Sequence, residues 1–181
     1  MEDCIIIVDN SNIWIEGMKY SAKLKGMPNT PDGKDACDFS WRIDFGKLLN
    51  VVSEGKSIRK AILVGSRPPK NDSLWNAAKS KGFEVIVQNR NAKNKEKAVD
   101  TSLVAVGTRL ICTTEPAVLK ILSGDSDFMP LIDVANDLGW ETEMWAFSSA
   151  LSTGSMATSV SKIEPLDSHL NEIQLSNTYI L

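Results

Sequence analysis

The sequence has little histidine and little cysteine, and it lacks a long hydrophobic run. His169 is the single histidine, so catalytic triads, histidine relays and histidine-rich zinc sites have almost nothing to build on. Cys4, Cys37 and Cys112 are odd in number and widely spaced, which argues against a disulfide framework or a zinc ribbon. No stretch approaches the roughly 20 apolar residues of a membrane-spanning helix. Any hydrolysis by this chain would therefore depend on carboxylate and metal chemistry.

The length and composition fit one globular domain. The 181 residues are 43% hydrophobic, enough for a substantial core. We expect a single domain over residues 1–170 and a C-terminal tail over 171–181. Glu2 and Asp3 open the chain and Asp9 cuts its first apolar run short, which is unlike a secretory signal. The expectation is a cytoplasmic protein without a membrane partner.

Short apolar runs alternate with helix-like segments along most of the chain. The runs are rich in branched residues and end in polar turn residues, which is typical of buried strands. Strands are predicted at 4–9, 61–65, 83–88, 118–123 and 140–147, and helices at 73–81, 95–112 and 129–138. In the 95–112 helix, Val99, Leu103, Val106 and Leu110 recur at helical spacing and predict the buried face. The alternation predicts a mainly parallel sheet covered by helices.

Four aspartates are the main functional signal. Asp9 ends the first strand, Asp125 and Asp127 follow the 118–123 strand, and Asp100 lies in the first turn of the 95–112 helix. Ligands of open α/β sheets collect at the carboxyl ends of the strands. Carboxylates gathered there repel one another, which raises their pKa values unless a cation bridges them. Oxygen ligands of this kind suit Mg²⁺ or Mn²⁺.

Each aspartate also has a purely structural interpretation. Asp9 to Asn12 could form a turn after the strand, and Asp125 could cap the helix that begins near Met129. Asp100 would be favoured in the first turn of a helix by the helix dipole. The sequence leaves both interpretations open.

Charge is distributed unevenly although the net charge is only −3. Residues 56–97 carry a net charge of +8, and residues 98–181 carry −8. A basic flank beside an acidic pocket suits a phosphate backbone led toward metal ions. Surface lysines that are simply solvated would give the same count.

Several motifs together resemble the NYN family of the PIN-domain-like nuclease superfamily. They are IIIVDNSNIW, WRIDFGKLL, KEKAVDTSLVAVG and ILSGDSDFMPLI, followed by a glycine and WETEMWAF, over roughly residues 4–168. The resemblance implies a three-layer α/β/α, PIN-like (Rossmann-like) fold and a ribonuclease that depends on Mg²⁺ or Mn²⁺. It also implies RNA as partner, expected to be single-stranded, and often a homodimer.

The resemblance assigns roles by motif position. Asp9, Asp100, Asp125 and Asp127 would hold the metal, and Asn12 would complete the catalytic group. The predicted substrate-binding residues are polar or basic: Ser11, Arg90, Lys93, Lys95, Lys97 and Ser126. One or two metal ions would polarise the scissile phosphate and activate the attacking water.

Two other functions remain open. A haloacid-dehalogenase-like phosphatase also has a nucleophilic aspartate after its first strand, but it needs a second aspartate where this chain has Ser11. A PIN-like domain that only binds RNA or a protein, with weak or no cleavage, would keep the same four aspartates. An assay of RNA cleavage with Mn²⁺ and with EDTA separates these functions.

Overall fold

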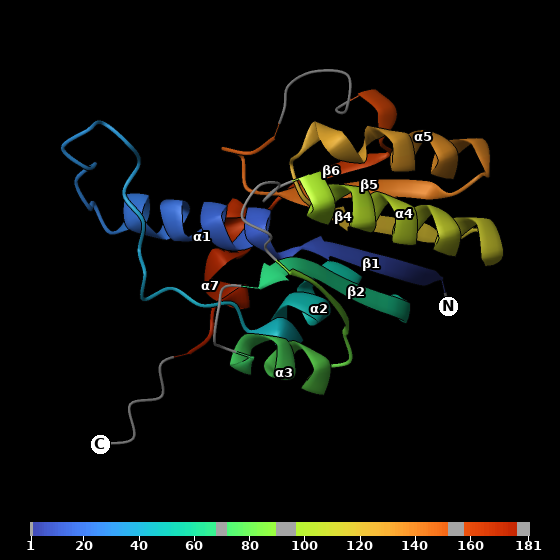
Figure 1. Cartoon of the computed structure of the whole chain (residues 1–181), viewed down its shortest axis with the longest axis horizontal. Helices are drawn as coiled ribbons and strands as arrows, with labels where there is room; N and C mark the ends of the chain where they lie inside the picture. Colours follow the sequence, from blue (N-terminus) through green and yellow to red (C-terminus); the bar gives the residue numbers. More distant parts are fainter. Residues whose placement is uncertain (1, 68–71, 90–96, 152–157, 177–181) are drawn as a thin grey trace.

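The computed structural model describes residues 2–67, 72–89, 97–151 and 158–176. Strands and helices alternate along it (Figure 1). In chain order they are β1 (Asp3–Asp9), α1 (Asn10–Leu24), α2 (Phe45–Ser53), β2 (Ser57–Arg67), α3 (Ser73–Ser80), β3 (Glu84–Asn89), α4 (Lys97–Thr113), β4 (Val118–Leu122), α5 (Met129–Asp137), β5 (Glu141–Ala146), β6 (Lys162–Pro165) and α7 (Leu170–Ile173). Two short 3₁₀ turns, η1 (Ser126–Phe128) and η2 (Leu166–His169), precede α5 and α7.

The six strands form one sheet in the order β3-β2-β1-β4-β5-β6, and every neighbouring pair is parallel. After β1, the strands β2 and β3 are added toward one edge of the sheet. The chain then returns to the other side of β1, where β4, β5 and β6 are added toward the opposite edge. The sheet therefore has its topological switch point between β1 and β4, where α/β folds bind ligands at the carboxyl ends of the strands. The register places Val8 beside Leu122, so the residues that follow them leave the sheet side by side.

Helices cover both faces of the sheet (Figure 1). One apolar core joins β1 and β2 to residues of α1, α2, α3 and α7, and it includes Ile13 and Phe45. The other joins the opposite face to α4 and α5, through residues such as Leu103 and Leu131. β1 is buried on both faces, which explains why Ile5 to Val8 form an uninterrupted apolar run. The predicted α/β/α class is confirmed.

The structure differs from the sequence-based expectation in the face of α4. Leu103, Gly107 and Ile111 are buried, whereas Val106 and Leu110 are only partly buried. A side-chain carbon at residue 107 would lie 2.6 Å from the Leu131 side chain, so glycine lets α5 approach α4 closely. The centre of the packed face is therefore a glycine, which a pattern of apolar residues does not mark.

The end of the chain also differs from expectation. The strand β6 extends the sheet beyond β5, although no strand was expected there. The predicted domain limit at residue 170 falls at the first residue of α7, whose Ile173 is fully buried. Leu175 then donates its backbone N–H to the Arg42 carbonyl. Residues after 170 thus contribute to the core in this structure.

Among the helices in the described part of the chain, none combines the length and apolar character that crossing a bilayer requires. The cysteines have different environments, since Cys4 is buried, Cys37 is half-buried and Cys112 is exposed.

Candidate functional site

The candidate site lies at the carboxyl ends of β1 and β4. β1 ends at Asp9 and α1 begins at the next residue, so no loop separates the strand from the helix. Asp9 Oδ1 accepts hydrogen bonds from the backbone N–H of Ser11 at 3.0 Å and of Asn12 at 3.2 Å. Asp9 is thus the N-cap of α1, and residues 10–12 form the first helical turn rather than a separate turn.

The turn after β4 lies against this cap. Ser123 Oγ donates to Asp9 Oδ2 at 3.4 Å and accepts from the Asp125 N–H at 3.2 Å. Asn12 Oδ1 accepts from the Gly124 N–H at 3.3 Å. The bonds from Ser123 to Asp9 and from Gly124 to Asn12 join two segments that are more than a hundred residues apart in the sequence. These contacts place Asp9 and Asn12 beside the turn that carries Asp125.

Asp125 and Asp127 belong to the tight turn that leads into α5. Asp125 Oδ1 accepts from the Asp127 N–H at 3.0 Å, which caps η1. Asp125 is partly exposed and Asp127 is exposed. Asp125 is therefore a cap, although the turn that it caps is η1 and not α5 itself, and Asp9 caps α1 where a separate turn was the structural alternative.

The carboxyl group of Asp9 is destabilised as an anion. Its residue is only 5% exposed, and burial raises the pKa of Asp9 above its ordinary value. Hydrogen bonds from Asn12, Ser11 and Ser123 oppose this rise, and the charge of Asp125 adds to it. Repulsion between carboxylates was the expected cause of a raised pKa, but burial is the larger one. A cation between the two groups would offset both causes, because its charge favours the ionised carboxylates.

Capping leaves ligand capacity on both carboxylates. Each uses Oδ1 for its cap, and Asp9 Oδ2 has only the long bond from Ser123. A carboxylate oxygen has further lone pairs available to a metal ion. The donor set is oxygen only, which fits Mg²⁺ or Mn²⁺. The described side chains contain no group of three His, Cys, Asp or Glu residues arranged for an ion.

Asp100 lies in the first turn of α4, but its side chain is outside the described residues. α4 follows β3 and so begins at the carboxyl edge of the sheet, and it contacts η1. The backbone at Asp100 therefore starts at the same edge as Asp9 and Asp125. Of the predicted basic residues, Arg90, Lys93 and Lys95 fall outside the described residues, as does the side chain of Lys97. Ser11 is partly buried and Ser126 is exposed.

Part of the expected basic flank lies elsewhere. Lys56 pairs with Glu2, Arg59 with Asp3, and Lys60 with Glu84. All three cations belong to the start of β2 or just precede it, at the amino edge of the sheet, opposite the candidate site. The sequence count therefore overstates the positive charge beside the aspartates, because these three charges are paired at the far edge.

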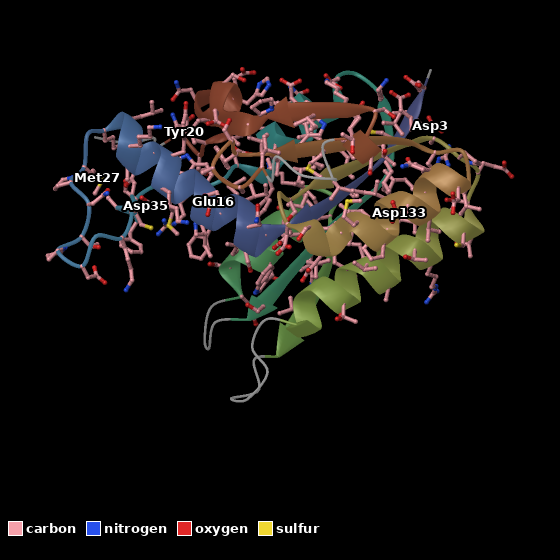
Figure 2. All side chains as sticks on the ribbon, turned by 90° about the horizontal axis from the view of Figure 1, so that it is seen from above. Asp3, Glu16, Tyr20, Met27, Asp35 and Asp133 are labelled. Carbon is pink, nitrogen blue, oxygen red and sulfur yellow. The ribbon has the colours of Figure 1, made fainter. Side chains whose placement is uncertain are left out.

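The sequence reasoning missed two residues of α1 that continue the row begun by Asn12. Asn12, Glu16 and Tyr20 are spaced one helical turn apart, and each contacts a segment that follows β4 or β5. Figure 2 labels Glu16 and Tyr20 on α1. Their positions four and eight residues after Asn12 were visible in the sequence. Asn10 was also missed: it is 6% exposed, and its Oδ1 has no hydrogen-bond donor in the structure as described.

Comparisons with known proteins agree with this architecture. The family model of the NYN domain matches residues 11–166. The curated proteins contain no match. The crystal structure of a protein of unknown function from Vibrio parahaemolyticus is similar with a TM-score of 0.68 and 16% identity, over 96% of each chain. At this level of identity the likeness shows the fold alone.

Proposed function

Because the chain belongs to the NYN domain family of PIN-like nucleases, we propose that it is a ribonuclease that depends on Mg²⁺ or Mn²⁺. The observation that carries the proposal is the pair of Asp9 and Asp125 at the topological switch point. Asp9 is buried without a cation among the described residues, and the nearby charge of Asp125 raises its pKa further. Such a pair is disfavoured unless a cation binds to it.

The proposed roles follow the geometry. Asp9 and Asp125 would hold the metal through their Oδ2 atoms, with Asp127 and Asp100 completing the site. When bound, the metal would stabilise charge on the scissile phosphate and lower the pKa of an attacking water. Asn12 keeps the Gly124 backbone in place through its Oδ1, so it would orient the turn that carries Asp125. Ser11 and Ser126 would hydrogen-bond the phosphate.

The substrate would be single-stranded RNA held by its backbone. Arg90, Lys93, Lys95 and Lys97 immediately precede or begin α4, which starts at the carboxyl edge of the sheet. Cations at that position would attract a phosphate backbone without regard to sequence. A homodimer is the assembly that we propose for the active protein, from the resemblance to PIN-like domains alone.

The test is cleavage of a labelled single-stranded RNA with Mn²⁺, with Mg²⁺ and with EDTA. We expect cleavage with either metal and none with EDTA. Asp125→Asn should lower the rate by about 100-fold or more, because it removes a ligand charge from the ion. Asp38→Asn is the matched control, since it makes the same change at a buried aspartate of another region.

Two results would count against the nuclease. If Asp125→Asn cleaves within a few-fold of wild type at equal purity, the activity does not come from this site. If wild type binds the RNA without cutting it under any of the three conditions, the domain is a binding module.

A further inference from the structure

Helix α1 lies against the turns that leave β4 and β5. Asn12 accepts from the Gly124 N–H, next to Asp125. One helical turn later, Glu16 Oε2 accepts from Ser149 Oγ at 2.6 Å. After another turn, the Tyr20 ring packs against Phe147 with 5.9 Å between the ring centroids. A single face of α1 therefore contacts both turns at the candidate site.

The turn at residues 147–150 is held from its other side as well. The Ala150 N–H donates to the Phe147 carbonyl at 2.8 Å. Asp167 Oδ2 accepts from the Ser148 N–H at 2.7 Å and from Ser148 Oγ at 3.0 Å. Ser149 and Phe147 are the residues of this turn whose side chains reach α1, through Glu16 and Tyr20. Removing the bond from Glu16 would thus free Ser149 from α1, while Asp167 and the contact between Tyr20 and Phe147 still hold the rest of the turn.

The same turn packs directly on Gly124. A side-chain carbon at Gly124 would lie 2.2 Å from the Ala150 carbonyl oxygen, which is closer than real carbon atoms come. The contact is between backbone atoms, so Gly124 cannot move toward this turn. These contacts form a closed ring. Asn12 accepts a hydrogen bond from Gly124, Gly124 packs against Ala150, and the neighbouring Ser149 donates to Glu16. Asn12 and Glu16 both belong to α1, which completes the ring.

We propose that Glu16 is a positioning residue of the candidate site. By holding Ser149, it keeps the 147–150 turn against Gly124, and Gly124 fixes the backbone that carries Asp125 relative to Asp9. Glu16 touches neither aspartate in the described contacts, so its effect passes through the ring. The expected effect on RNA cleavage rests on the proposed nuclease function, whereas the expected effect on the Gly124 backbone does not.

The ion pair of Glu16 with Lys19 offers a simpler role for the same carboxylate. Lys19 Nζ lies 2.7 Å from Glu16 Oε1, three residues along the helix, and its side chain is 33% exposed. Pairs of this kind contribute little to stability. Glu16 uses a different oxygen for each partner, so substitutions can separate the two roles.

The experiment compares Glu16→Ala, Glu16→Gln and Ser149→Ala with the control Lys19→Ala. Glutamine keeps an oxygen that accepts from Ser149, whereas Lys19→Ala removes only the ion pair. The first measurement is hydrogen exchange of the Gly124 N–H, which needs no activity. We expect exchange about tenfold faster in Glu16→Ala and Ser149→Ala, and near wild type in the other two.

The second measurement is RNA cleavage with Mn²⁺. We expect kcat to fall about 10- to 100-fold in Glu16→Ala and Ser149→Ala with KM almost unchanged, and to recover in Glu16→Gln. Unchanged exchange at Gly124 in Glu16→Ala would overturn the proposal, as would faster exchange with an unchanged kcat. If wild type cleaves no RNA, the proposed function fails, and exchange at Gly124 alone decides the role of Glu16.

Discussion

Asp38 and Asp9 are both buried aspartates, but their surroundings shift their pKa values in opposite directions. Asp38 accepts hydrogen bonds from Lys25 Nζ at 2.5 Å, Ser21 Oγ at 2.6 Å, Ser40 Oγ at 2.5 Å and the Ser40 N–H at 3.0 Å. Burial alone would raise the pKa of Asp38, but these bonds outweigh it and hold the pKa well below its ordinary value. Asp9 has weaker donors, and its pKa is raised.

The two carboxylates differ in their partners and also in how much protein surrounds them, since Asp9 lies deeper than Asp38. The two residues are 4% and 5% exposed, so their solvent access is almost the same. Lys25 supplies a positive charge to Asp38 from within the chain. Among the described residues, the groups with the largest effects on the pKa of Asp9 include no cation, and the charge among them is that of Asp125. The negative charge of Asp38 is therefore balanced by a lysine of the protein, whereas the negative charge of Asp9 would be stabilised by a cation bound from solution.

Their positions agree with this contrast. Asp38 closes residues 25–38, which belong to the irregular segment between α1 and α2, because Lys25 and Asp38 form an ion pair across them. This segment projects with the end of α1 away from the sheet (Figure 1), and Met27 and Asp35 are labelled on it (Figure 2). Asp9 lies at the switch point of the sheet. Asp38 therefore serves the fold, and Asp9 serves the proposed site.

The largest stability effect is expected at Asp38. Asp38→Asn should destabilise the protein at pH 7 by about 2 kcal/mol, because it removes the charge that accepts from Lys25. A depressed pKa gives stability above the unfolded value of about 3.9, and this stability is lost as pH falls through the folded pKa. The deficit of the variant should therefore shrink in acid. Chemical denaturation from pH 3 to pH 7 measures it, and a deficit independent of pH would contradict the ion pair.

A smaller effect of opposite sign is expected at Asp9 in EDTA. Asparagine keeps the cap acceptor but carries no charge, so Asp9→Asn should melt a few degrees above wild type at neutral pH. A raised pKa gives stability below the unfolded value of about 3.9, and this stability is lost as pH rises through the folded pKa. The two proteins should therefore converge in acid. A variant that melts below wild type at every pH would assign Asp9 to capping alone.

The smallest effect concerns the lysines before α4. Replacing Lys93, Lys95 and Lys97 together with alanine should weaken RNA binding uniformly across sequences. The slope of log affinity against log salt should fall by about 0.7 for each lysine that neutralises a phosphate of a single strand. Lys56→Ala is the control, because Lys56 pairs with Glu2 at the opposite edge. An unchanged slope in the triple variant would show that these lysines are ordinary surface charges.

Local patterns in the sequence predicted much of the fold. The strands containing Ile5 and Ile121 are buried on both faces, so their composition marks them plainly. β6 was missed because its four residues, KIEP, include two charges and a proline and are at most partly buried. The buried face of α4 was misplaced because Gly107 lies at its centre. A closely packed glycine and a strand with few apolar residues do not produce a periodic hydrophobic pattern in the sequence.

The candidate site was predictable to a similar extent. Asp9, Asn12 and Asp125 follow strands, and parallel strands bring their carboxyl ends together. The bond between Glu16 and Ser149 joins residues 133 positions apart and depends on where α1 lies over the sheet edge. The pairing of Lys56, Arg59 and Lys60 at the opposite edge likewise depends on strand register. Charge counts along a sequence do not contain that information.

The most direct measurement is the thermal stability of wild type, Asp9→Asn and Asp38→Asn, each in EDTA and in Mn²⁺. Mn²⁺ at about 100 times its dissociation constant should stabilise wild type by about 2.7 kcal/mol, because only the folded protein binds it. Asp38→Asn should be less stable than wild type in EDTA and should gain the same stability from Mn²⁺. Asp9→Asn should start above wild type and gain almost nothing. If Mn²⁺ leaves wild type unchanged, and Asp9→Asn melts below it in EDTA, then Asp9 is a helix cap and the proposed metal site does not exist.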